Sequence, residues 1–125
     1  MAAQAITITA YNDPLTTFST NGIGTANVLE AVRLLDKRCN VIVVTSDKSY
    51  RNNEWIWGYR ENDVLAGKDP YSASKSVADI IANSYYHSFF KKNDKIKIAA
   101  CRAGNVMGGG AVSYTHLTLP TKPSV

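Results

Sequence analysis

A tyrosine and a lysine stand four residues apart in Tyr71-Ser-Ala-Ser-Lys75, directly after Pro70. Proline is tolerated in the first turn of a helix, so the pair is expected near a helix start, with both side chains on one face. A nearby ammonium favours a phenolate, which lets the tyrosine act as a base near neutral pH. The spacing is frequent by chance, so a surface tyrosine beside a surface lysine is the competing interpretation.

A second polar group, Thr45-Ser46-Asp47-Lys48, follows the apolar residues 41–44. A short run of β-branched residues predicts a strand buried on both faces, as in a parallel sheet. Ligands bind at the carboxyl ends of such strands, so the polar residues are either turn formers or site residues. Because Tyr71 lies on the helix that follows this strand, the fold could bring Ser46 and Tyr71 together.

Two helices and a second strand complete the framework. Apolar spacing near three and four residues predicts helices over residues 14–35, started by Asp13, and over residues 71–90. The predicted buried stripes are Leu15, Phe18, Ala26, Leu29, Val32 and Leu35, and Val77, Ile80, Ile81, Ser84, Tyr85 and Phe89. Residues 47–68 are expected to be a long loop, 96–100 a strand and 102–110 a glycine-rich loop. Alternating helices and strands predict an α/β fold with a doubly wound parallel sheet.

Glycines weaken the middle of the first helix. Gly22 and Gly24 are unfavourable there unless another backbone or a ligand comes close. They do not form a dinucleotide-binding GxGxxG loop, because they lie inside a helix and do not follow a strand.

The composition describes an ordinary globular chain of at most one domain, with 125 residues, 45% hydrophobic residues and 19% charged residues. The net charge of +4 is mild, and the clustered Lys91, Lys92, Lys95 and Lys97 flank a helix-to-strand turn, so nucleic-acid binding is not expected. No membrane-spanning run or signal peptide is evident. Cys39 and Cys101 lack a metal-binding or disulfide pattern, which favours free thiols in the cytoplasm and no metal site.

Four stretches carry a narrower likeness to a known family: residues 44–48 (VTSDK), 54–61 (EWIWGYRE), 69–75 (DPYSASK) and 102–108 (RAGNVMG). With Ala2-Ala-Gln4, Asn21 and Gly24-Thr25, they resemble the CDP-glucose 4,6-dehydratases. These enzymes belong to the NAD-dependent epimerase/dehydratase group of extended short-chain dehydrogenases. The resemblance covers essentially residues 1–110 and implies a Rossmann-like sheet and a dehydration in which NAD is regenerated.

The resemblance implies a role for each residue of the two polar groups. Tyr71 would take the proton of the sugar 4-hydroxyl, and Ser46 would hydrogen-bond the same hydroxyl. Lys75 would keep Tyr71 ionised and bind the nicotinamide ribose. Asp47 would protonate the hydroxyl that leaves from C6. Lys48 occupies the position where many related dehydratases carry a glutamate base.

Further positions follow from the same resemblance. The implied cofactor-binding residues are Ala3, Asn21, Thr45, Tyr71, Lys75 and Gly104. The implied contacts with the nucleotide-sugar substrate, CDP-glucose, are Ser46, Arg102 and Asn105. Trp55, Trp57, Tyr59 and Arg60 would either shape the substrate pocket or serve packing or a subunit contact. A homodimer is the family expectation for the parent protein.

The end of the chain differs in character. Residues 112–121 match, codon by codon, a translated sequencing adapter from transposase-based library preparation, whose first two bases complete Ala111. We therefore expect residues 111–125 to be a non-native, disordered tail and residues 1–110 to be part of an NAD-binding domain. The expected fragment lacks the N-terminal βαβ units, with their pyrophosphate loop, and the C-terminal substrate domain. It should be marginally stable and inactive alone.

Two other functions remain open. Another extended short-chain enzyme, such as an epimerase, shares Tyr71 and Lys75, although epimerases need no water-eliminating pair like Asp47 and Lys48. A non-catalytic α/β module is the second alternative. The joint presence of Ser46, Tyr71 and Lys75 argues for a catalytic parent.

Overall fold

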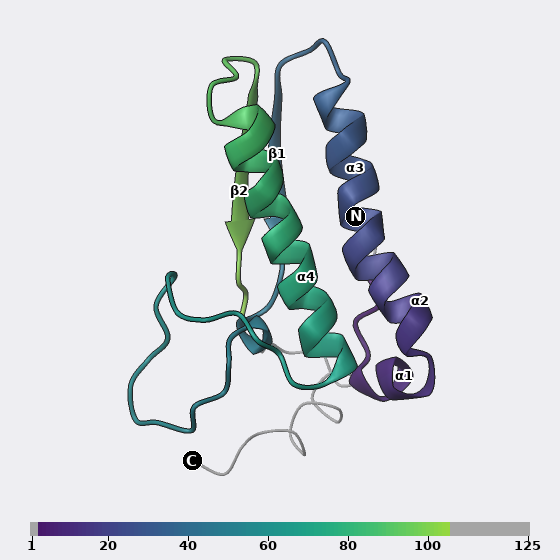
Figure 1. Ribbon diagram of the computed structural model, residues 1–125, viewed down its shortest axis with the longest axis vertical. Helices are drawn as coiled ribbons and strands as arrows, with labels where there is room; N and C mark the ends of the chain where they lie inside the picture. The colour runs from purple at the N-terminus through teal and green to yellow at the C-terminus, as the bar shows by residue number, and fades with distance from the viewer. Residues whose placement is uncertain (1–2, 106–125) are drawn as a thin grey trace, which may run out of the picture.

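The computed structural model describes residues 3–105 as two parallel strands with helices packed against them (Figure 1). The strands are β1 (Cys39–Val44) and β2 (Ile96–Cys101). The helices are α1 (Thr7–Asn12), α2 (Pro14–Phe18), α3 (Gly24–Arg33) and α4 (Pro70–Tyr85), with π-helical segments at Ser19–Ile23 and Tyr86–Phe90 and a 3-10 turn at Asp47–Ser49. Both predicted strands and the predicted parallel α/β arrangement are confirmed.

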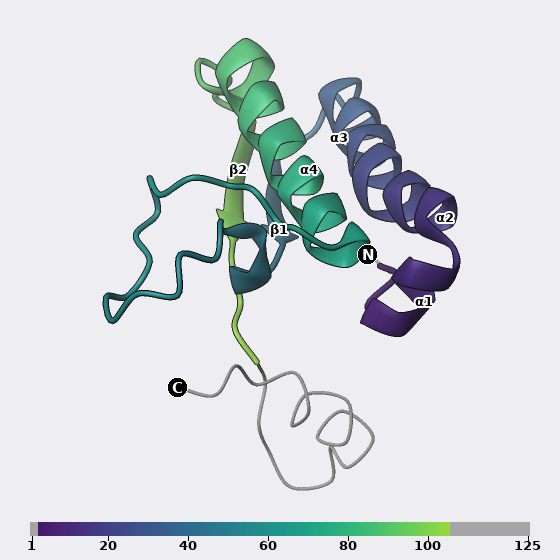
Figure 2. The ribbon, with the colours of Figure 1, turned by 60° about the horizontal axis from the view of Figure 1, so that its bottom comes forward.

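The two strands pair in register from Cys39 opposite Ile96 to Val44 opposite Cys101. The helix α4 connects them along the chain, and α3 and α4 lie on the same side of the sheet (Figure 2). Within residues 3–105 the other face carries no helix, and Ile42, which points that way, is 66% exposed. The expectation that the first strand is buried on both faces is therefore wrong for this part of the chain.

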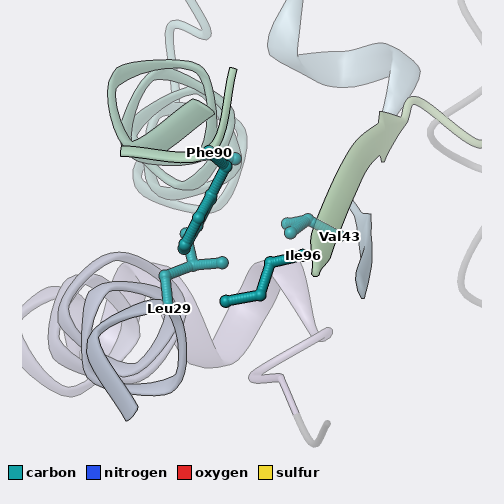
Figure 3. Close-up of a cluster of buried hydrophobic side chains, with 5 residues drawn as sticks. Leu29, Val43, Phe90 and Ile96 are labelled. Carbon is teal, nitrogen blue, oxygen red and sulfur yellow. The ribbon is translucent and has the colours of Figure 1, made fainter. Parts of the chain in front are cut away.

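The apolar core lies between the sheet and the two long helices. Leu29 of α3, Val43 of β1, Phe90 after α4 and Ile96 of β2 point into one cluster (Figure 3), which Ala82 completes. Because the helices approach from one side, one row of side chains from each element is enough to form this core.

The first predicted helix is continuous but irregular. The Asp13 side chain accepts a hydrogen bond from the Thr16 backbone N–H at 3.0 Å, as predicted for a helix start. Gly22 is buried in the π-helical segment, where an added Cβ would lie 3.0 Å from Cγ1 of Val77 in α4. The glycine therefore serves the close approach of another element. The short helix α1 was not predicted, because it buries only Ala10 and has no side-chain cap.

The predicted buried stripes need correction. Leu15 is 81% exposed, Leu35 is also exposed, and α3 ends at Arg33. Of the second predicted stripe, Val77, Ile80 and Ser84 of α4 and Phe89 of the π-helical segment are exposed. The fully buried residues of α4 are small or polar: Ser72, Ser74, Lys75, Ser76, Ala78, Asp79 and Ala82. Small side chains let α4 lie close to its neighbours, while the predicted Ile81 and Tyr85 are partly buried against the apolar core and Val77 lies over Gly22.

Residues 47–68 form the predicted long loop, which contains the short turn at Asp47–Ser49 and an isolated antiparallel bridge between Tyr50 and Leu65. The predicted glycine-rich loop is described only as far as Asn105. The rest of that loop and the predicted tail, residues 111–125, lie outside the described residues.

Candidate active site

The tyrosine and lysine of the predicted pair lie in the first two turns of α4. Pro70 occupies the first turn, and the Asp69 side chain accepts a hydrogen bond from the Ser72 N–H at 3.0 Å, which fixes the helix start. Lys75 is only 8% exposed, and burial holds the pKa of its ammonium below the ordinary value. Within residues 3–105 its amino group forms no hydrogen bond or ion pair. It is thus a buried cation one helical turn from Tyr71.

The segments that follow the C-terminal ends of β1 and β2, the strand exits, run side by side. The Thr45 N–H donates to the Cys101 carbonyl at 2.7 Å, and the Asp47 N–H donates to the Ala103 carbonyl at 3.0 Å. A Cβ added at Gly104 would lie 3.5 Å from a carboxylate oxygen of Asp47. The predicted site residues that follow β1 and β2 therefore lie next to one another at the carboxyl ends of the strands.

Ser46 begins the turn that carries Asp47 and Lys48. Its hydroxyl lies 3.2 Å from Oδ1 of Asp47 and accepts a hydrogen bond from the Lys48 N–H at 3.2 Å. The turn is attached to α4, because the Ser76 hydroxyl donates to the Ser49 carbonyl at 2.8 Å. Ser46 is buried and Asp47 is exposed, so the carboxylate is the more accessible of the two groups.

Asn21 connects the start of the described chain to α4. Its side-chain oxygen accepts from the Gln4 N–H at 3.0 Å, and its amide donates to the Gln4 carbonyl at 3.0 Å and to the Ser74 hydroxyl at 2.8 Å. Ala3, Asn21 and Lys75 line a common cavity of about 80 Å³ beside β1. Three of the residues predicted to bind the cofactor thus share one cavity.

Arg102 has a different environment from the one expected of a substrate ligand. Its Nε and Nη2 donate to the two carboxylate oxygens of Asp79 at 2.8 and 2.9 Å. Its Nη1 donates to the Tyr50 hydroxyl at 2.8 Å and to the Glu61 carbonyl at 2.7 Å. Four of its five N–H donors are therefore used within the chain.

Asp79 is not among the predicted site residues, although the sequence contains a signal for it. Asp79 follows Lys75 by four residues, so Tyr71, Lys75 and Asp79 occupy one face of α4, and a carboxylate on a buried helical face requires partners. Its partner Arg102 is 23 residues away in sequence, which no local pattern indicates.

The aromatic residues of the long loop stack on one another. Tyr50 and Tyr59 lie 5.2 Å apart at 11°, and Trp55 packs on Tyr59 at 5.7 Å. The Arg102 guanidinium lies 4.9 Å from the centre of the Tyr50 ring. Ile56 and Trp57 at the loop tip are exposed, and Arg60 is exposed as well, so these side chains are accessible to a substrate or to a second subunit.

Among the described residues there is no group of three metal-ligating side chains. No helix in that part of the chain has the length and apolar content required to cross a bilayer. The cysteines are free and sit at opposite ends of the strand pair.

Solved structures with the same arrangement include enzymes that act on nucleotide sugars. The UDP-glucose 4-epimerase of Thermus thermophilus, in complex with NAD, superposes with a TM-score of 0.69 at 26% identity and covers 86% of this chain and 33% of that chain. A double mutant of DesIV, the dTDP-glucose 4,6-dehydratase of Streptomyces venezuelae, with NAD bound, gives 0.68 at 22% identity over 81% and 30%. The fold is thus that of the Rossmann-type short-chain dehydrogenases.

Sequence comparison defines the family. The family described as GDP-mannose 4,6 dehydratase matches residues 1–99, so the chain belongs to that family. The CDP-glucose 4,6-dehydratase of Salmonella typhimurium is 45% identical over 114 residues, which are 88% of this chain and 32% of that protein. The chain spans about a third of the length of the curated relatives it matches.

Proposed function

We propose that this chain is the part of an NAD-dependent nucleotide-sugar 4,6-dehydratase that carries its reacting groups, with CDP-glucose as substrate and CDP-4-keto-6-deoxyglucose as product. The observation that carries the proposal is the buried Lys75 ammonium one turn from Tyr71, on a helix attached to the turn that holds Ser46 and Asp47. The proposal assigns residues 1–110 to a partial NAD-binding domain and treats residues 111–125 as non-native.

The residues that line the cavity beside Lys75 suit the ribose of a cofactor of this kind. The cavity is lined by the Lys75 side chain and by Asn21 and Ala3, and the lysine has N–H donors that no described residue accepts. The hydroxyl groups of a ribose are suitable acceptors for an ammonium. Thr45 and Gly104 complete the proposed cofactor contacts at the strand ends. NAD, when bound, supplies the hydride acceptor and returns the hydride later in the cycle.

Tyr71 and Ser46 act at the sugar 4-hydroxyl. The Lys75 charge favours ionised Tyr71, which removes the hydroxyl proton as the carbon is oxidised. The Ser46 hydroxyl positions the same oxygen by a hydrogen bond. Oxidation to the 4-ketone acidifies the proton at C5, which makes the elimination of water across C5 and C6 feasible.

Asp47 donates the proton with which the C6 hydroxyl leaves as water. Its exposed carboxylate and its closeness to Gly104 leave one side accessible to a substrate. Lys48 stands at the position of the glutamate base in related dehydratases, and in this proposal its amine takes the C5 proton while Asp47 gives its own proton to the leaving hydroxyl.

Substrate binding and assembly extend the proposal. Asn105 and Arg102 follow β2 and would lie near the nucleotide sugar. The parent would be a cytoplasmic homodimer. Exposed apolar side chains are candidates for the contact between subunits: Val77 and Ile80 on α4, and Ile23 in the π-helical segment before α3. The chain alone would be inactive, because it spans only about a third of its relatives.

The test is an assay of the full-length protein encoded at the source locus, supplied with NAD and CDP-glucose. The expected product is lighter than the substrate by one water, as read by mass spectrometry. Tyr71→Phe should lower the rate roughly 10²–10⁴-fold. Tyr86→Phe, a matched change at an exposed position at the end of the same helix, should leave the rate unchanged.

The competing functions predict other products. A product of the same mass as the substrate would indicate an epimerase and overturn the dehydratase proposal. Failure to convert any of CDP-, UDP-, dTDP- and GDP-hexoses would favour a non-catalytic module.

A further inference from the structure

The carboxylate of Asp79 is buried in the middle of α4 and accepts three hydrogen bonds. Two come from Arg102, as described above, and the third comes from the Thr45 hydroxyl to Oδ2 at 3.0 Å. Asp79 is 2% exposed. Burial alone would raise its pKa, but the bonds from Arg102 and Thr45 outweigh that effect and hold the pKa below its ordinary value.

Arg102 extends these contacts to two further segments. Through the Tyr50 hydroxyl and the Glu61 carbonyl it reaches the turn after β1 and the long loop. The Asp79–Arg102 pair therefore connects the middle of α4, the exits of both strands and the loop between β1 and α4.

We propose that Asp79 and Arg102 are positioning residues for the dehydration. They set the distance between α4, which carries Tyr71 and Lys75, and the strand exits, which carry Ser46 and Asp47. The inference rests on the proposed function, because it takes these four residues as the reacting groups. It also gives Arg102 a role through its neighbours instead of a direct contact with substrate.

The positions along the chain make this role effective. Thr45 directly precedes Ser46, and Lys75 precedes Asp79 by one helical turn. A shift of α4 relative to the strand exits would separate a buried carboxylate from a guanidinium. Such a separation is costly, so the pair resists it more strongly than an apolar contact would.

The experiment compares variants of the full-length protein by steady-state kinetics. Asp79→Asn keeps the shape of the side chain but presents an amide N–H₂ to donors, which disrupts the bonds to Arg102 and Thr45. We expect kcat to fall roughly 100-fold while KM for the nucleotide sugar stays within about twofold, as for a misplaced reacting group. Tyr50→Phe removes one acceptor of Arg102 and keeps the stacked ring, and kcat should fall about fivefold.

Leu29→Ala serves as the control, because it weakens the apolar core and lowers the free energy of unfolding without changing the contact between Asp79 and Arg102. Each rate is divided by the folded fraction of that variant. A purely structural role for Asp79 would give the same corrected kcat in Asp79→Asn and Leu29→Ala, and that result would overturn the proposal. If Asp79→Asn does not fold, an unchanged kcat in Tyr50→Phe overturns it.

The proposed function and the positioning role of Asp79 and Arg102 are rejected by different results. Absence of water loss with the unsubstituted protein removes the proposed function itself. Normal dehydration by the unsubstituted protein, with unchanged kcat in both variants, removes only the positioning role.

Discussion

The apolar core and the polar cluster at the strand exits are held together by different forces. The core around Leu29, Phe90 and Ile96 depends on non-directional burial, which tolerates small shifts of one side chain against another. The cluster around Asp79 and Arg102 depends on hydrogen bonds of 2.7–3.0 Å, which lose strength when the geometry changes. The core should therefore govern stability, and the cluster should govern geometry.

The largest expected effect on stability comes from the core. Leu29→Ala should lower the free energy of unfolding of the full-length protein by about 2–5 kcal/mol, because a buried leucine leaves a cavity when truncated. Chemical denaturation measures the change. Val28→Ala, at the adjacent exposed position, should cost far less, and equal losses for the two variants would contradict the division of roles.

A smaller effect is expected from the polar cluster in acid. The folded-state pKa of Asp79 is depressed, so its contribution to stability is present above the unfolded pKa of about 3.9 and is lost as the pH falls through the folded pKa. Thermal midpoints between about pH 7 and pH 3 should drop more steeply for the unsubstituted protein than for Asp79→Asn.

Hydrogen bonds also lower the pKa values of other carboxylates, among them Asp13, Glu30 and Asp36. They are common to both proteins, so the difference between the two curves isolates Asp79. Parallel curves would show that the buried pair adds nothing to acid stability.

The smallest expected effect separates activity from stability at one residue. Burial lowers the pKa of Lys75, so its charge costs folding free energy, and Lys75→Met should raise the thermal midpoint by a few degrees. The same change should abolish dehydration. Lys91→Met, at an exposed position, should alter neither property, and a lower midpoint for Lys75→Met would reveal a stabilising partner of the ammonium.

Local patterns are sufficient to predict the two strands and the long helices, but not the short helix α1. The β-branched run at residues 41–44 and the capping residue Asp13 predicted features that the structure confirms. The buried face of α4 is predicted only in part, because Ile81 and Tyr85 pack against the core but Ile80 does not. The fully buried positions of α4 are instead small or polar, and their selection depends on distant partners such as Asn21, which bonds Ser74, and Arg102, which bonds Asp79.

The candidate site shows the same limit. The pair Tyr71 and Lys75 is visible because four-residue spacing is a local property of a helix. The pairing of Asp79 with Arg102 joins residues 23 positions apart, from the middle of α4 to the end of β2. The stacking of Tyr50 on Tyr59 depends on how the long loop folds. Neither can be predicted from spacing alone.

The π-helical segment at Ser19–Ile23 also constrains how this region could evolve. In it the Gly24 N–H bonds to the Ser19 carbonyl, five residues back, so the segment accommodates one more residue than a regular helical turn. Loss of one residue there would restore a regular helical turn and leave α3 beyond it in nearly the same orientation, so Leu29 would stay in the core. The deletion would instead disturb the segment itself, where Asn21 bonds Gln4 and Ser74, so its cost should fall on the candidate cofactor cavity and not on the core.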